Sequence, residues 1–243
     1  MNLLASKKSW LLAPVAVALW AALLICAWAN MTPGEALAAF DADGRSPVEL
    51  MTLPLFALIV PLAWLCPPNG GGMRRQCLWS SLWSVLAVVA IVRETDLHKA
   101  LFAKIWPAVD AGFKGTVFKM RFLRAADVPL APKLFVIAFF AVFFAVVAIP
   151  LARYLVPLVR GFFKMEPVCW TMAFFGAVSA AVLVVDRLPS KLKHAGVELG
   201  DSAVALIKIF EEGGEALMAL LALLAILQSH ALFGRAETGG EAG

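Results

Sequence analysis

The sequence predicts an all-α protein, a polytopic transmembrane bundle of about six helices with an amphipathic interfacial segment after the third. Of its 243 residues, 62% are hydrophobic and only 16% are charged, whereas soluble domains are closer to half apolar and a quarter charged. The apolar residues fall in blocks long enough to cross a bilayer core of about 30 Å at a rise of about 1.5 Å per residue. We therefore expect residues 1–243 to form a single integral-membrane domain.

Six apolar blocks are long enough to be membrane spans. The second block contains Pro54 and Pro61, which predict a kink, and Pro150 closes the fourth. Alanines at helical spacing in the fourth and fifth blocks predict close helix packing within lipid. The predicted spans are residues 10–29, 50–66, 77–92, 134–151, 168–185 and 216–233, and a short polar tail, residues 234–243, follows them.

An even number of spans puts both chain termini on one side of the membrane. We call this side the terminal face and the other side the opposite face. Short connections on the terminal face are basic, with Arg74, Arg75, Arg153 and Arg160, and contain few acids. Because the positive-inside rule gives most weight to short loops, this pattern favours a cytoplasmic terminal face in a bacterial-type inner membrane. The plain count of Lys and Arg favours the other orientation, because the long connections of the opposite face contain more of them.

The connection between the third and fourth spans, residues 97–133, is too long for a simple link. Leu101, Phe102 and Trp106 fit a helical spacing in its first half, and phenylalanines alternate with basic residues in its second half. This pattern predicts a helical segment in the lipid headgroup layer. The basic side chains either hold a substrate phosphate or contact anionic lipid headgroups. They are Lys114, Lys119, Arg121 and Arg124.

Ionisable residues collect where three predicted spans reach the opposite face. The third span ends in VRETDLHK, residues 92–99, the fifth ends in Asp186 and Arg187, and the sixth begins with EEGGE, residues 211–215. Side chains from facing helices form the metal sites of many helical bundles. The two glycines of EEGGE predict a kink or the close approach of another backbone. The three segments therefore predict a cluster, provided that the span count is right.

Spacing within these segments selects the candidate site residues. Glu94 and His98, like Glu211 and Glu215, are separated by four residues, which places each pair on one helix face. These four are the predicted metal ligands, and they suit a divalent Zn, Mn or Fe ion. The remaining polar residues of the cluster have other predicted roles. Asp96, Asp186 and Glu212 are candidate acids or bases, and Arg93 and Arg187 join the basic loop residues as candidate substrate ligands.

These residues lead to three functional hypotheses. The first is a metal-assisted or acid/base enzyme that acts on a lipid or lipid-linked phosphate. The second is a scaffold or accessory subunit whose salt-bridge network fixes helix register and docks a membrane-protein partner, and the third is a proton- or cation-coupled transporter. We expect the bilayer, and anionic lipid in particular, as a partner. We expect no nucleic-acid partner, because the net charge of +4 is not gathered in a basic run. The sequence contains no HExxH, GxSxG or Walker-type motif.

Overall fold

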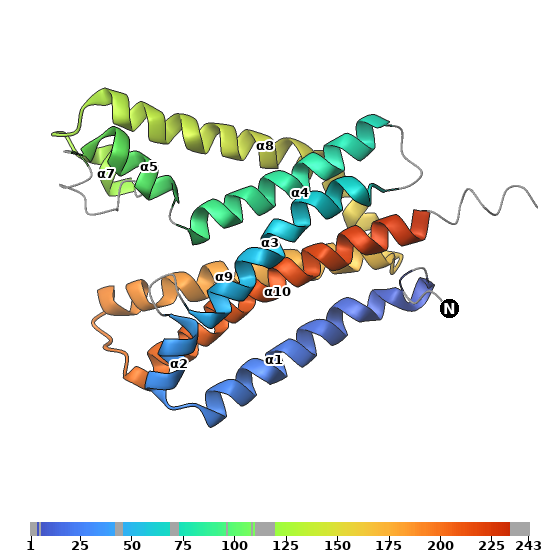
Figure 1. Ribbon diagram of the computed structural model, residues 1–243, viewed down its shortest axis with the longest axis horizontal. Coiled ribbons are helices and arrows are strands. Elements are labelled where there is room, and N and C mark those ends of the chain that lie inside the picture. The colour runs from blue at the N-terminus through green and yellow to red at the C-terminus, as the bar shows by residue number, and fades with distance from the viewer. Residues whose placement is uncertain are drawn as a thin grey trace, which may run out of the picture.

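Every element in the described part of the structure, a computed structural model, is a helix (Figure 1). The structure describes residues 4, 6–41, 46–68, 73–95, 97–107, 109 and 120–233. The long helices are α1 (Leu12–Asn30), α3 (Pro47–Leu65), α4 (Met73–Glu94), α8 (Leu130–Phe163), α9 (Pro167–His194) and α10 (Asp201–Phe233). The short ones are η2 (Lys7–Leu11), α2 (Pro33–Phe40), α5 (Leu97–Ile105) and α7 (Met120–Arg124).

Six helices of the described chain are long and apolar enough to cross a membrane, which confirms the predicted helical bundle of a multi-pass membrane protein. The first three spans match the predicted ones to within a few residues. Helices α8, α9 and α10 extend beyond the predicted spans, and α10 begins at Asp201 rather than at residue 216. The EEGGE segment therefore lies within α10 rather than at its beginning, and its three glutamates are buried in the bundle. The spanning segments are Lys8–Asn30, Pro47–Leu65, Gln76–Glu94, Leu130–Ile149, Pro167–His194 and Asp201–Leu232.

Successive spans run in opposite directions, so the two faces of the bundle differ in what they carry (Figure 1). The beginning of α1, the end of α3, the beginning of α4 and the end of α10 lie at the terminal face. Helices α2, α5 and α7 and the connection from α9 to α10 lie at the opposite face. This arrangement brings the end of α4 and the beginning of α10 to the same end of the bundle, as the even span count predicts.

Helix α10 is the central helix of the bundle. Of its spanning window, 56% is buried inside the protein, compared with 11–28% for the other five spans. It packs against α1, α2, α3 and α9. Near the terminal face, Thr171 Oγ1 donates to Gln228 Oε1 at 2.7 Å, and Gln228 Nε2 donates to the Ser9 carbonyl at 3.0 Å. These two bonds tie α10 to α9 and to η2.

The glycines of EEGGE let two helices approach α10 closely. A Cβ atom at Gly213 would lie 2.4 Å from Leu24 Cδ2 of α1, and one at Gly214 would lie 2.4 Å from Val182 Cγ2 of α9. Trp20 Nε1 of α1 donates to the Gly213 carbonyl at 2.7 Å. Of the two predicted roles of these glycines, the structure therefore shows the close approach, which holds the neighbouring glutamates inside the bundle.

The segment after the third span forms α5 and α7, which pack against the beginning of α8. Phe102, Phe122 and Val136 are each 0% exposed in this small core. The rings of Phe102 and Phe122 meet edge to face, with centroids 5.6 Å apart, and Trp106 packs on Phe135 at 5.2 Å. Phe102 and Trp106 of the amphipathic pattern therefore pack against a transmembrane helix, whereas Leu101 is 49% exposed.

The close approach at Gly214 predicts a specific loss of stability. Gly214→Leu is expected to lower the melting temperature in detergent by several degrees, because the new side chain needs the space of Val182, and overpacking of this kind costs about 1–3 kcal/mol. Ala177→Leu is the matched control, since Ala177 is an exposed residue of α9. Equal melting temperatures for the two variants would show that the helices do not approach closely here.

Candidate functional site

An ion pair joins the end of α4 to the EEGGE segment of α10. Arg93 Nη2 lies 2.6 Å from Glu215 Oε1. The Glu215 side chain is only 4% exposed, whereas that of Arg93 is 48% exposed. A buried carboxylate without a cation is costly within a membrane. Arg93 therefore compensates Glu215 and keeps part of its own guanidinium accessible.

A second ionic contact joins α10 to the end of α2. Lys208 Nζ lies 3.0 Å from Asp41 Oδ1 and 3.2 Å from Glu211 Oε2. Asp41 is the C-cap residue of α2, and the side chains of Lys208 and Glu211 are one turn apart on α10. Lys208 therefore pairs with both Glu211 and Asp41, and the second pair holds the short helix α2 against the bundle.

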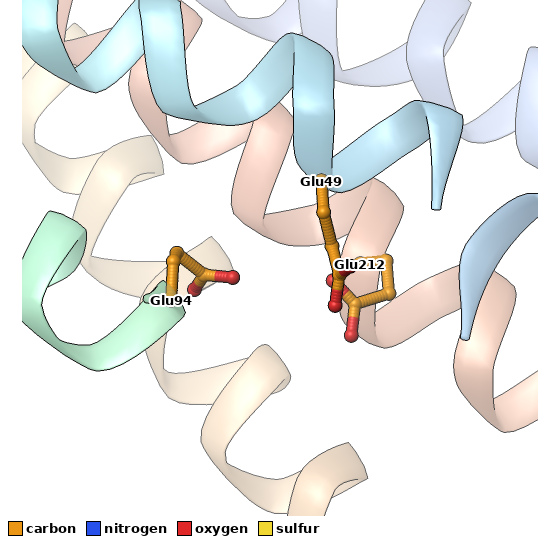
Figure 2. Close-up of side chains that lie close together, drawn as sticks. All are labelled: Glu49, Glu94 and Glu212. Atoms are coloured by element: carbon orange, nitrogen blue, oxygen red, sulfur yellow. The ribbon is translucent and has the colours of Figure 1, made fainter. Parts of the chain in front are cut away.

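Three further carboxylates meet beside these ion pairs. Glu49 of α3, Glu94 of α4 and Glu212 of α10 each offer an oxygen, and the three oxygens lie within 4.8 Å of one another. Figure 2 shows Glu49 and Glu212 side by side, with Glu94 pointing toward them from α4. Glu212 is 8% exposed, and the other two are partly buried. We call Glu49, Glu94 and Glu212 the carboxylate triad.

Local sequence explains why each member of the carboxylate triad lies where it does. Glu49 is the third residue of α3 and belongs to a capping box, in which its Oε2 accepts from the backbone N–H of Ser46 at 3.2 Å. Glu94 is the last residue of α4. Glu212 precedes Gly213, where α1 packs closely on α10. Three helices therefore each deliver one carboxylate to the same point.

Negative charge exceeds positive charge in this part of the protein. Glu215 lies close enough to both Glu94 and Glu212 to interact with them electrostatically. Asp186 of α9 interacts with Arg93 and Glu211. Among the described groups of this network, the cations are Arg93 and Lys208, and the carboxyl groups are Asp41, Glu49, Glu94, Asp186, Glu211, Glu212 and Glu215. The excess acids require protons or a bound cation, because unpaired charges at such sites are expensive.

The structure brings together most of the predicted acidic residues but groups them differently. The sequence predicts that Glu94 shares a metal with Glu211 and Glu215. In the structure, Glu211 forms an ion pair with Lys208, and Glu215 forms one with Arg93. Glu212, predicted as an acid or base, instead joins Glu94 in the carboxylate triad. Asp186 and Arg187 are exposed near the end of α9, and Arg124 is exposed at the end of α7.

Several predicted site residues fall where the structure gives no placement. Asp96, Lys114 and Lys119 lie outside the described residues. His98 is in α5 and Arg121 is in α7, but their side chains also lie outside the described part. The predicted roles of these five residues, including the imidazole ligand, therefore stay predictions.

The prediction from sequence missed three residues of the cluster, namely Asp41, Glu49 and Lys208. A signal for Glu49 was present, because Ser46-Pro47-Val48-Glu49 is a capping-box pattern that starts a helix on the opposite face. The i, i+3 spacing of Lys208 and Glu211 also predicts a contact along α10. Nothing in the sequence pairs Asp41 with Lys208, because this contact depends on how α2 packs.

Comparisons with known proteins give no family for this chain. No protein-family model, no curated protein and no solved structure matches it. The geometry of the carboxylate triad and its ion pairs is therefore the basis for a functional proposal.

The Arg93–Glu215 ion pair predicts strong coupling between the two residues. Arg93→Gln is expected to destabilise the protein by about 1–3 kcal/mol, because it leaves Glu215 buried without its cation. Glu215→Gln in the same chain should recover most of that loss. Unfolding of the two single variants and the double variant measures the coupling. Additive effects of the two substitutions would contradict the ion pair.

Proposed function

We propose that this multi-pass protein binds a divalent cation at the carboxylate triad and uses it in metal-assisted or acid/base chemistry on an anionic lipid or lipid-linked phosphate. The observation that carries this proposal is that Glu49, Glu94 and Glu212 converge from three separate helices, with oxygens within 4.8 Å of one another. Side chains on different helices of a folded bundle are held in place, which is what a metal site requires.

The chemistry of the donor set supports a hard cation. All three members of the carboxylate triad offer carboxylate oxygens. Oxygen ligands suit Mg²⁺ and Mn²⁺ better than softer metals. Of the predicted ions Zn, Mn and Fe, Mn²⁺ fits this set best. Three protein ligands leave coordination positions for water or for a substrate oxygen.

The excess negative charge supports the same proposal. Glu212 is buried. Its neighbours Glu211 and Glu215 already form ion pairs, with Lys208 and Arg93 respectively. Arg93 and Lys208 interact electrostatically with Glu94 and Glu212, but their described ion pairs are with Glu215, Asp41 and Glu211. A divalent ion would neutralise two charges of the carboxylate triad without adding another buried side chain, which lowers the cost of placing three carboxylates together.

The surroundings of the carboxylate triad favour an anionic substrate. The Arg93 side chain is 48% exposed, so the guanidinium can contact a ligand while Nη2 holds Glu215. Arg187 is exposed on α9 and follows Asp186, which interacts with Arg93. A metal ion held by the carboxylate triad would polarise a phosphate that these cations bind. We place the terminal face in the cytoplasm of a bacterial-type cell, on the basis of its short basic loops.

Metal analysis of the purified protein tests this proposal. After incubation with Mn²⁺ and gel filtration, we expect the wild-type protein to retain one equivalent by elemental mass spectrometry. Glu212→Gln should weaken retention by more than about tenfold, because an amide is a poorer ligand than a carboxylate. Glu198→Gln is the matched control, since Glu198 is exposed in the connection between α9 and α10.

Two results would contradict the metal site. The first is a wild-type protein that retains no more Mn²⁺ than a detergent blank. The second is a Glu212→Gln protein with an unchanged melting temperature that retains as much Mn²⁺ as the wild type.

A second candidate function is proton- or cation-coupled transport. It is favoured by the burial of Glu211, Glu212 and Glu215 within a helix long enough to span the membrane, with Glu94 beside Glu212. Buried carboxyl groups with exchangeable protons are characteristic of transport pathways.

Liposome measurements separate transport from metal-assisted chemistry. A transporter in liposomes should acidify or alkalinise the lumen when a cation gradient is imposed, and Glu94→Gln should abolish that flux. The metal-dependent enzyme should show no flux in the same liposomes. A protein with neither flux nor metal would be an accessory subunit, and both proposals would be wrong.

A further inference from the structure

Two of the described helices begin with the same kind of capping box. TPGE, residues 32–35, starts α2, and SPVE, residues 46–49, starts α3. In each box the N-cap hydroxyl accepts from the backbone N–H of the glutamate, and the carboxylate accepts from the backbone N–H of the N-cap residue. Their surroundings differ, because Thr32 is exposed whereas Ser46 is 0% exposed and leads to a member of the carboxylate triad.

The capping box of α3 engages one oxygen of Glu49. Glu49 Oε2 accepts from the backbone N–H of Ser46 at 3.2 Å, and the backbone N–H of Glu49 donates to Ser46 Oγ at 3.1 Å. Groups that hydrogen-bond a ligating carboxylate orient it and tune the metal that it binds. Oε2 is therefore held toward the start of α3, and Oε1 is the oxygen that this bond leaves free.

A buried carboxylate faces Glu49 from α10 (Figure 2). Glu212 is 8% exposed, and it forms no hydrogen bond or ion pair with any other residue that the structure describes. A buried carboxylate without such a partner is costly, and a cation at the carboxylate triad would relieve that cost. Such an ion would lie between Glu212 and the free oxygen of Glu49.

We infer that Ser46 is a positioning residue that makes the carboxylate triad select Mn²⁺ over Ca²⁺. This inference rests on the metal site of the proposed function. With Oε2 held by the Ser46 N–H, Glu49 binds the ion through one oxygen. Six single oxygens satisfy an octahedral ion such as Mn²⁺, whereas Ca²⁺ takes about six to eight oxygens and often uses a bidentate carboxylate. The capping box therefore removes a ligand oxygen that Ca²⁺ would use.

Two substitutions at position 46 separate the N–H from the hydroxyl. Ser46 has φ −65° and ψ 146°, which proline also adopts, so Ser46→Pro removes the N–H without a change of backbone conformation. It should free Oε2 and let Glu49 bind an ion through both oxygens. Ser46→Ala removes only the hydroxyl and keeps the N–H. It should lower the melting temperature, as the loss of an N-cap does, and keep the wild-type selectivity.

The capping box of α2 offers a matched control. Thr32 has φ −69° and ψ 156°, and its N–H donates to Glu35 Oε2 at 2.8 Å. Thr32→Pro therefore removes the same bond at the start of another helix, where the glutamate is not part of the carboxylate triad. It controls for the loss of a capping box and for the added proline.

Competitive metal binding tests the inference. Each purified protein is dialysed to equilibrium against equimolar Mn²⁺ and Ca²⁺, and elemental mass spectrometry gives the ratio of the two bound ions. A loss of folded protein lowers both ions together, so a purely structural effect leaves the ratio unchanged. We expect the wild type, Ser46→Ala and Thr32→Pro to favour Mn²⁺ by more than about tenfold. Ser46→Pro should reduce the ratio about tenfold, as changes around ligating residues commonly do.

The outcomes distinguish this inference from the proposed function. A wild-type ratio near one, or equal ratios for Ser46→Pro and Thr32→Pro, would overturn the role of Ser46 and leave the metal site in place. If the wild type binds neither ion, the metal site is wrong and the inference is wrong with it.

Infrared difference spectra of the wild type give a second readout that does not require Ser46→Pro to fold. On Mn²⁺ binding we expect the wide separation of carboxylate stretching bands that is typical of binding through one oxygen. A narrow separation, typical of bidentate binding, that disappears in Glu49→Gln would overturn the inference.

Discussion

The structure depends on the neutralisation of carboxylates that α10 holds inside the bundle. Three glutamates of α10 are each less than a tenth exposed, and they lie inside its membrane-spanning segment. They are Glu211, Glu212 and Glu215. Lys208 forms an ion pair with Glu211, and Arg93 forms one with Glu215. Glu212 instead faces two more carboxylates, from α3 and α4. Replacing buried ion pairs with apolar side chains is often neutral or stabilising, which is why we propose that these glutamates serve binding or chemistry.

The packing around α10 fits this requirement. Gly213 and Gly214 bring α1 and α9 so close that a methyl group on either residue would collide with Leu24 or Val182. These contacts cover one side of α10, and the glutamates beside the two glycines are buried. Where lipid and water are excluded, the attraction between opposite charges increases and so does the cost of an unpaired charge. Tight packing around the EEGGE segment therefore strengthens its ion pairs and also makes them necessary.

Much of the fold could be predicted from the sequence, because the membrane imposes simple rules. Apolar block length defined six spans, and the even count placed Glu94, Asp186 and Glu211 at one end of the bundle. The pairing within the cluster could not be predicted. Glu211 and Glu212 are about 100° apart on α10, so which of them meets which helix depends on the rotation of α10. That rotation is fixed by glycine contacts and by Trp20, which act over long sequence separations.

Glu49 shows most clearly why part of the site was not predictable. Its capping role can be predicted from four consecutive residues of the sequence. Its proximity to Glu94 and Glu212, however, depends on how three helices pack together. Similarly, Asp41 enters the network only because α2 folds back onto α10. Local patterns therefore identify which residues start and end the helices, whereas the partners of buried charges follow from the bundle as a whole.

Anomalous X-ray diffraction from Mn²⁺-soaked crystals, collected on both sides of the manganese absorption edge, tests the central claim most directly. The account predicts one anomalous peak between the carboxylates of Glu49, Glu94 and Glu212, at distances of about 2.0–2.3 Å from their oxygens. It also predicts that Arg93 stays on Glu215 and Lys208 on Glu211. An absence of any peak, with the three carboxyl groups hydrogen-bonded directly to one another, would contradict it and would show that protons neutralise the carboxylate triad.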